Sequence, residues 1–345
     1  MSWRIEGLAA GQDAERIAGI NGSAIPDDLV IPFRTVRSGV AGRLVRLGKS
    51  VDRILQRHSY PAAVGQALGE ALALTALLGT GLKIEGRLIL QTKSDGALGL
   101  LVVNYDTPGH LRGYASFDAE RTAEISNGNG VVDPEALYGT GHLAMTIDPG
   151  GDMDRYQGIV ALEGQPLTDA ALTYFRQSEQ LPTFLRLAVA RVYVPGENEG
   201  ADDWHWRAGG LLLQNLAREG GQGLDENFSE SEAEPYGEAL PLEDDDDDGW
   251  QRTRILAATV EDHELIDPML APDRLLYRLF HEEGVRVHDA HAIEERCRCS
   301  RERVESFLRR FEGAQLDEMR EPDGAISVTC EFCSTTYRFE PGEIG

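Results

Sequence analysis

All four cysteines of this 345-residue chain lie in one stretch near its C-terminus. They form two close pairs, Cys297-Arg298-Cys299 and Cys330-Glu331-Phe332-Cys333, separated by thirty residues. Each pair can bind one metal ion only if the backbone turns tightly there, and two such turns supply the four sulfurs that tetrahedral zinc prefers. We therefore predict one zinc ion per chain in the reduced protein, bound by Cys297, Cys299, Cys330 and Cys333. The alternative is that a nearby histidine replaces one of the sulfurs, the candidates being His281, His288 and His291.

The thirty residues between the two pairs predict a helix followed by a hairpin. Ser300 can cap a helix that ends at Gly313, because apolar residues follow it at i, i+3, i+4 and i+7. These residues are Val304, Phe307, Leu308 and Phe311. A turn at 322–324 and alternating apolar residues then predict two short strands, one on each side of the second cysteine pair. A module of about fifty residues buries too little surface to fold alone, so zinc, worth about 10–16 kcal/mol in comparable modules, would serve as its core.

Three arginines, Arg296, Arg298 and Arg301, crowd the first cysteine pair. Their positive charge would favour the reactive thiolate form of the cysteines, which suggests redox chemistry. The same pattern also fits a zinc ion that only holds the module together. The spacing of the cysteines does not separate these two interpretations.

The charge balance limits the possible partners. The formal net charge is −25, which opposes binding to phosphate backbones, so we expect no nucleic-acid function. Between Leu224 and Gly249 there are twelve carboxylates and no lysine or arginine. Such a segment cannot bury apolar surface, so residues 219–249 are predicted to be a disordered acidic insertion without a specific partner.

Neither secretion nor membrane insertion is expected. The first residues, Met1 to Glu6, contain no apolar run of the kind that forms a signal peptide. The most apolar stretch, Ala67 to Leu82, is interrupted by Glu70 and is too short to span a bilayer. Cysteines confined to one metal-binding module are typical of a reducing compartment. We therefore expect a cytoplasmic protein.

The N-terminal part of the chain predicts an α+β domain. A helix should begin near Ser59 and run to about Leu78, and its small residues suggest close packing against a sheet. Apolar runs predict strands, with one helix at about 168–178 among them and no regular βαβ alternation. The predicted strands lie at 88–90, 98–103, 111–117, 141–147, 156–162 and 184–194.

Four units follow from these patterns: a core domain at 1–218, the acidic insertion at 219–249, a helical linker at 250–290 and the zinc module at 291–345. The linker should contain helices at 252–260 and 272–283. The second has one apolar face, formed by Leu275, Leu276, Leu279 and Phe280, which must be buried on something. It is either docked permanently on the core domain or docked in a way that depends on the zinc module.

No catalytic signature emerges, so we expect that the protein is not an enzyme. Gly139-Thr140-Gly141 imitates part of a dinucleotide-binding fingerprint, but it leads into a strand rather than opening a helix. Ser178-Glu179-Gln180 has the composition of an acid–base site, but it is better interpreted as a helix end before Leu181-Pro182.

The cysteine spacing and the residues around it resemble the redox-regulated heat-shock chaperone family, the 33 kDa chaperonins. The resemblance extends over nearly the whole chain. Matching stretches lie at 277–283, 299–303, 94–96, 113–115, 178–183 and 208–214. It implies a holdase that is inactive when reduced and zinc-bound. Oxidation would form disulfides, release zinc, unfold the linker and expose apolar surface that binds unfolding proteins without ATP. The resemblance also implies that the active form is a homodimer.

Two other functions remain possible at this point: a thiol–disulfide oxidoreductase using Cys330 and Cys333, and a zinc-ribbon adaptor. The first is disfavoured because the Cys-x-x-Cys motif does not open a helix. For the oxidised chaperone, four cysteines allow three disulfide connectivities, and sequence does not choose among them. Closure entropy favours the short loops, so we predict the pairs Cys297–Cys299 and Cys330–Cys333.

Overall fold

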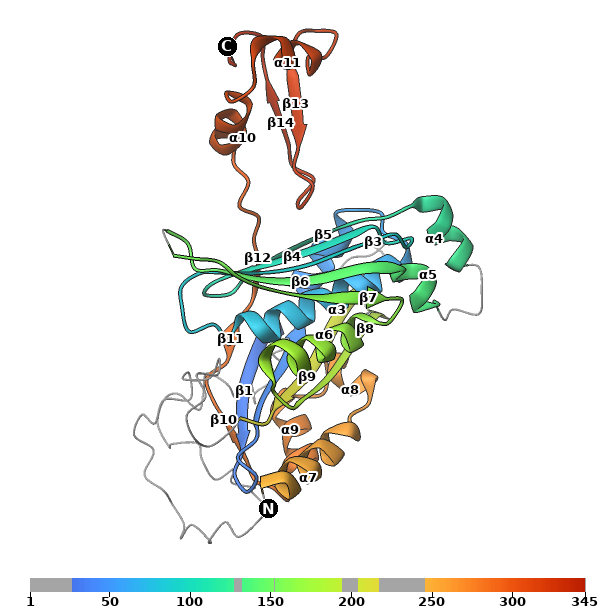
Figure 1. Ribbon diagram of the computed structural model, residues 1–345, viewed down its shortest axis with the longest axis vertical. Helices are drawn as coiled ribbons and strands as arrows, with labels where there is room; N and C mark the ends of the chain where they lie inside the picture. Colours follow the sequence, from blue (N-terminus) through green and yellow to red (C-terminus); the bar gives the residue numbers. More distant parts are fainter. Residues whose placement is uncertain (1–26, 127–131, 152, 194–203, 217–245, 345) are drawn as a thin grey trace.

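Helix α3, Ala62–Gly79, lies between two β-sheets and forms the centre of the fold (Figure 1). In the computed structural model, the described residues are 27–126, 132–151, 153–193, 204–216 and 246–344. Small residues let both sheets approach the helix: a Cβ added at Gly69 would lie 2.7 Å from the Val189 side chain, and one at Gly79 would lie 2.3 Å from Tyr105. By length and composition alone α3 is apolar enough to cross a membrane, but 83% of that stretch is buried inside the protein. It is therefore the core helix of the domain.

The first sheet, sheet A, has the strand order β10-β1-β2-β9-β8, with β11 also paired to β1. All its pairings are antiparallel. Its strands are β1 (Leu29–Thr35), β2 (Ala41–Leu47), β8 (Thr183–Tyr193), β9 (Trp204–Gln214), β10 (Val285–Val287) and β11 (His291–Ala292). Strands β1 and β2 and the following helix α2 (Lys49–Gln56) lie before Ser59, where the sequence patterns predict no element.

The second sheet, sheet B, has the strand order β12-β5-β4-β3-β6-β7, and only the β12–β5 pair is parallel. Its strands are β3 (Arg87–Ser94), β4 (Leu100–Asp106), β5 (His110–Ser116), β6 (Thr140–Asp148), β7 (Tyr156–Glu163) and β12 (Glu294–Glu295). Helices α4 (Ala119–Ser126) and α5 (Pro134–Tyr138) join β5 to β6, whereas α6 (Leu167–Tyr174) and a π-helical turn (Phe175–Glu179) join β7 to β8. The predicted α+β class is confirmed, and Gly141 lies inside β6, as expected.

Three linker helices cover the face of sheet A that α3 does not touch: α7 (Asp246–Ala258), α8 (Asp262–Ile266) and α9 (Pro272–Phe280). The four predicted apolar residues of α9 are all buried. Phe280 stacks on Phe33 of β1, with ring centroids 5.4 Å apart. Most of the predicted acidic insertion lies outside the described residues, but α7 begins at Asp246, within the acidic run.

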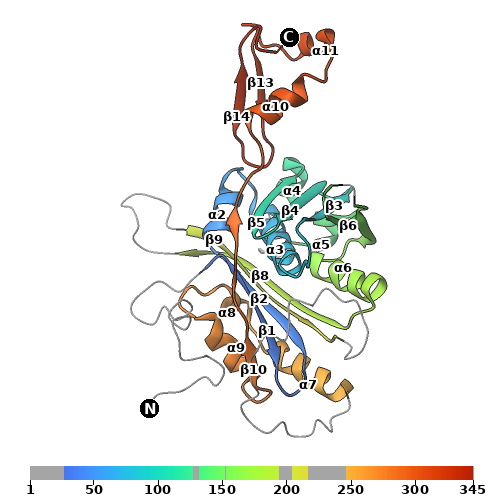
Figure 2. The same cartoon turned by 90° about the vertical axis from the view of Figure 1, so that its left-hand side faces the viewer.

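The C-terminal module consists of α10 (Arg301–Leu308), α11 (Gly313–Glu318), β13 (Ile326–Thr329) and β14 (Thr336–Phe339) and projects from sheet B (Figures 1 and 2). Ser300 caps α10 as predicted, because its hydroxyl accepts a hydrogen bond from the Arg303 N–H. One expectation is wrong: the helix ends at Leu308, and Gly313 starts α11 behind a capping box of Glu312 and Gln315. Phe307, one of the four apolar residues at helical spacing, is 54% exposed.

Candidate metal centre

The four cysteines come from two separate segments of the C-terminal module. Cys297 and Cys299 lie in the extended chain between β12 and α10, whereas Cys330 and Cys333 lie on the turn between β13 and β14. This turn is tight: the Ser334 N–H donates to the Cys330 carbonyl at 2.8 Å, and the Cys330 N–H donates to the Thr335 carbonyl at 2.9 Å. Ser334 has a φ of 55°, which reverses the chain directly after Cys333. The predicted turn at the second pair is therefore present.

The fold brings all four sulfurs together, within 4.8 Å of one another. The Sγ atoms of Cys299 and Cys333 are 3.2 Å apart, and those of Cys297 and Cys330 are 3.7 Å apart. Four sulfurs that each lie about 2.3 Å from a tetrahedral zinc ion are roughly 3.8 Å apart. The cluster therefore fits a four-sulfur metal site, and the histidines weighed as substitutes are not members of it.

Two side chains around the cluster were not anticipated as part of the site. The Tyr337 hydroxyl donates to the Cys299 sulfur at 3.2 Å, and the Cys333 thiol lies 3.3 Å from the Thr335 hydroxyl. Sequence alternation marked Tyr337 only as a strand residue. Its role depends on the β13–β14 pairing, which places Tyr337 opposite Val328 at the end of the hairpin nearest the cysteines. Hydrogen bonds to a coordinating sulfur are a common way of orienting it.

The thiols influence one another's ionisation. Burial raises the pKa of Cys299 to about 12, although the hydrogen bond from Tyr337 opposes this shift. Burial acts in the same direction on Cys333, but hydrogen bonds with Thr335 and with neighbouring thiols outweigh it and lower that pKa to about 7. Four negative charges this close together would repel strongly without a cation between them. The cluster is thus suited to bind a divalent metal ion as four thiolates.

The three arginines near the first pair do not act on the sulfurs through direct contacts. Arg298 forms an ion pair with Asp106 at 3.1 Å, and Arg301 forms one with Glu343 at 2.8 Å. Arg296 lies 3.2 Å from a ring nitrogen of His110. The expected electrostatic support for the thiolates is therefore weaker than the sequence suggested, since each guanidinium has another partner.

The turn that carries Cys330 and Cys333 also contacts the core domain (Figure 2). Phe332 lies under the guanidinium of Arg112 and 6.3 Å from the ring of Tyr114, both on β5. The Ser334 hydroxyl donates to the Arg57 carbonyl at 3.2 Å, just after α2. The second cysteine pair is thus directly joined to the surface formed by sheet B and α2.

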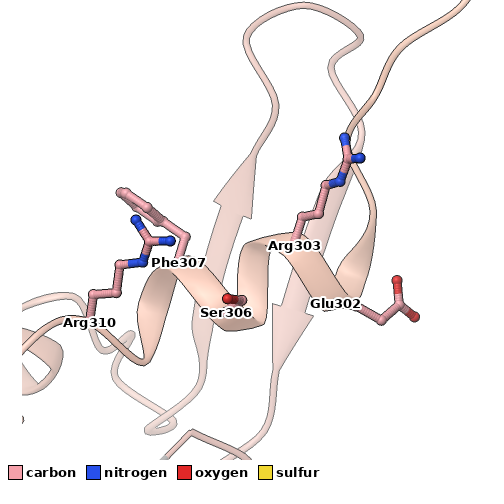
Figure 3. A pocket seen from close by; sticks show the side chains of 5 residues that line it. All are labelled: Glu302, Arg303, Ser306, Phe307 and Arg310. Carbon is pink, nitrogen blue, oxygen red and sulfur yellow. The ribbon is translucent and has the colours of Figure 1, made fainter. Parts of the chain in front are cut away.

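An open hollow of about 380 Å³ lies on α10, lined by Glu302, Arg303, Ser306, Phe307 and Arg310 (Figure 3). None of these residues is a cysteine, so the hollow is separate from the sulfur cluster. Four of its five residues belong to α10, Arg310 follows the end of that helix, and Phe307 is an exposed side chain of the lining.

Comparison with known proteins agrees with this architecture. The family model described as "Hsp33 protein" matches residues 28–340. A protein named 33 kDa chaperonin from Caulobacter vibrioides is 42% identical over 319 residues, covering 92% of this chain and 97% of the relative. The 33 kDa chaperonin from Pectobacterium carotovorum is 34% identical, with 88% and 90% covered.

A crystal structure of the 33 kDa chaperonin from Thermotoga maritima, a heat shock protein 33 homologue, superimposes with a TM-score of 0.68 at 20% identity. It covers 92% of this chain and 96% of its own, and at this identity it demonstrates a shared fold. The extent of the family match and the identity to these relatives lead to one conclusion: the chain belongs to the Hsp33 chaperone family.

Proposed function

We propose that this protein is a redox-regulated, ATP-independent holdase chaperone that binds unfolding proteins and prevents their aggregation under oxidative stress. Its membership of the Hsp33 family and the name 33 kDa chaperonin carried by its relatives support the chaperone role. The observation that carries the redox part is the convergence of four cysteine sulfurs within 4.8 Å.

In the reduced protein, Cys297, Cys299, Cys330 and Cys333 would hold one zinc ion. When bound, zinc supplies a four-coordinate cross-link between two segments, not catalysis. The module needs such a link because its own apolar core is small, consisting of Leu308, Leu316, Ile326, Phe339 and Ile344. Folding of so small a unit depends on its metal.

Oxidation would remove the ligands. Each disulfide forms as two thiols lose two protons and two electrons to an oxidant such as hydrogen peroxide, which is reduced to water, or hypochlorous acid. We propose that the disulfides are Cys297–Cys299 and Cys330–Cys333. In the reduced geometry sulfurs of different pairs also lie 3.2 and 3.7 Å apart, so this pairing rests on closure entropy and not on the distances.

The chain connectivity suggests how unfolding of the zinc module would loosen the linker. Directly before Cys297, β12 pairs with β5, and β11 and β10 pair with β1. These strands contribute only two or three residues each. Few hydrogen bonds therefore separate α9 from the module, and loss of the module would weaken the attachment of the linker.

Release of the linker would expose a continuous apolar surface. Helices α7 to α9 bury the outer face of sheet A, including Ile31, Phe33, Leu44 and Leu211. A contiguous apolar patch of this kind, once uncovered, is the type of surface that binds other proteins. Unfolding clients would bind there and on the released linker.

The remaining features follow from the family and the composition. We propose a cytoplasmic protein that is not an enzyme, binds neither nucleic acid nor membrane, and forms a homodimer when oxidised. The working units are the core domain at 1–218, the acidic insertion at 219–249, the linker at 250–290 and the zinc module at 291–345.

The test is an aggregation assay by light scattering on a chemically denatured client, run beside a colorimetric zinc-release measurement. Oxidised protein should suppress aggregation in proportion to the zinc released, and reduced protein should not. Equal activity of the two forms would refute the redox switch, and no activity of either form would refute the holdase.

A further inference from the structure

Two buried arginines project from sheet A toward the linker. Arg46 on β2 is completely buried, and its guanidinium donates to the Glu264 carbonyl at 2.9 Å and to the Asp267 carbonyl at 2.7 Å. Arg207 on β9 is 6% exposed and donates to the Ile266 carbonyl at 2.7 Å and to Asp27 at 2.6 Å. The three carbonyls belong to the C-terminal end of α8 and the residue that follows it.

A glycine forms the floor between these arginines. Gly209 is paired with Arg46 in the β2–β9 register, and a Cβ added there would lie 2.3 Å from the Leu265 carbonyl oxygen. Only glycine therefore lets the backbone of α8 rest directly on the sheet. Next to it, Leu44 and Leu211 form a second register pair on the same face, which accepts apolar side chains.

The chemistry of this arrangement suits the end of a helix. The last carbonyls of a helix lack intrahelical partners and carry its partial negative charge, so guanidinium donors complement both features. Burial lowers the pKa of Arg46 to about 10, which leaves it charged at neutral pH. Its Nε atom is buried without a hydrogen-bond partner, so the two carbonyls are its hydrogen-bond compensation for lost water, and the nearby Asp27 carboxylate adds charge stabilisation.

We propose that Arg46, Arg207 and Gly209 form a carbonyl socket, a binding site for the C-terminal end of a helix. In this structure α8 fills it. Once the linker has left, as the proposed function requires, helix ends in partly unfolded client proteins fill the same socket and place apolar side chains on Leu44 and Leu211. The linker therefore competes with the client for this polar socket and also covers the apolar face of sheet A.

The test measures binding of a fluorescein-labelled peptide of residues 259–268 to oxidised full-length protein by anisotropy. Arg46→Met keeps side-chain length but removes the donors, and we expect its affinity to fall roughly ten- to a hundredfold, as for hydrogen bonds to a charged group. Arg43→Met is the matched control, because Arg43 is also buried on β2, at 6% exposed, but points to the opposite face, against Gly81. It should bind like wild type, and denatured client should displace the peptide.

Equal peptide affinity of Arg46→Met and Arg43→Met would overturn the proposal, as would a client that binds without displacing the peptide. If Arg46→Met fails to fold, Gly209→Ala replaces it, since the added methyl group occupies the floor while both arginines remain. It should also bind the peptide more weakly, and unchanged affinity would count against the socket.

The aggregation assay on the same oxidised sample tests the proposed function separately. If oxidised protein does not suppress aggregation, peptide binding is measured on reduced Leu265→Ala protein. In this variant α8 has lost the buried Leu265 side chain that packs it on the sheet. Tighter binding than to reduced wild type would support the socket, and equal binding would overturn it.

Discussion

Arg112 of β5 lies over the ring of Phe332, with its guanidinium carbon 4.1 Å from the ring centroid. Phe332 stands between Cys330 and Cys333, so a residue inside the second cysteine pair contacts the core domain. The candidate metal site and the docking of the module therefore share the same short turn. A change at the sulfurs reaches sheet B without passing through any other element.

Phe332→Ala should loosen this docking while leaving metal binding intact. A cation–π contact at a partly exposed position contributes about 0.5–1 kcal/mol, so the undocked fraction should rise two- to fivefold. Trypsin cleavage after Arg296 or Arg298 in the reduced protein measures it. Phe307→Ala is the control, because Phe307 is an exposed aromatic residue whose ring contacts Phe311 of the same module edge-to-face. Equal cleavage rates of the two variants would contradict this role.

Phe280→Ala should release the linker without oxidation. Loss of a buried phenylalanine costs about 3–5 kcal/mol, so the population with an exposed sheet A face should rise at least a hundredfold. The reduced variant should bind a hydrophobic dye and suppress client aggregation. Tyr277→Ala, on the same helix but 54% exposed, should behave like wild type. A reduced Phe280→Ala protein that stays inactive would show that this contact does not hold the linker.

Cys330→Ser should abolish tight zinc binding, because a serine hydroxyl is not ionised at neutral pH and coordinates zinc poorly. Without metal, the helix–hairpin module should lose its structure while the core domain remains folded. Elemental analysis of the purified protein measures the zinc, and hydrogen exchange of residues 301–339 measures the loss of structure. Full retention of zinc would remove Cys330 from the ligand set.

Complete oxidation should join Cys297 to Cys299 and Cys330 to Cys333. Short loops are entropically easier to close once the metal no longer holds the segments together. Peptide mapping by mass spectrometry identifies the pairs. A dominant product that joins Cys299 to Cys333, whose sulfurs are 3.2 Å apart in the reduced geometry, would mean that oxidation fixes the module instead of releasing it.

Deleting residues 224–245 should leave zinc binding and redox activation unchanged, because a segment this acidic cannot contribute apolar burial to the docked state. The deletion should stop before Asp246, where α7 begins, since the Gly249 carbonyl accepts a hydrogen bond from the buried Thr253. Solubility of the oxidised form should fall, as the acidic run opposes self-association. Constitutive aggregation-suppressing activity of the reduced deletion variant would instead make the segment part of the switch.

Short-range sequence patterns correctly predicted the parts of this fold that depend on neighbouring residues in the chain. The Ser300 cap, the turn before Ile326 and the apolar face of α9 depend on neighbours within a few residues, and each is present. The end of α10 was missed because Gly313 has two roles open to it, and the capping box of Glu312 and Gln315 favours a helix start.

Long-range relationships were not accessible from the sequence. The pairing of β11 with β1 and of β12 with β5 joins residues far apart in the chain through two-residue strands that carry no periodic signal. The Tyr337 contact with Cys299 and the carbonyls bound by Arg46 likewise depend on tertiary packing. From sequence alone, an arginine in a strand is predicted to face solvent. Its burial becomes apparent only when the position of the covering helix is known.

The short strands before Cys297 give the linker a direction of release. Reading backward from the first cysteine pair, the chain passes β12 in sheet B, the buried Ile293, β11 and β10 in sheet A, and then the buried side chains of α9. Release that starts at the sulfurs therefore has to free β12 and Ile293 before it reaches α9. Under the proposed mechanism, a brief loss of the module would free only β12 and would be reversed, whereas a sustained loss would reach Phe280. The proposed switch would then respond to lasting oxidation and not to a passing fluctuation, because release of α9 requires the module to stay unfolded for longer.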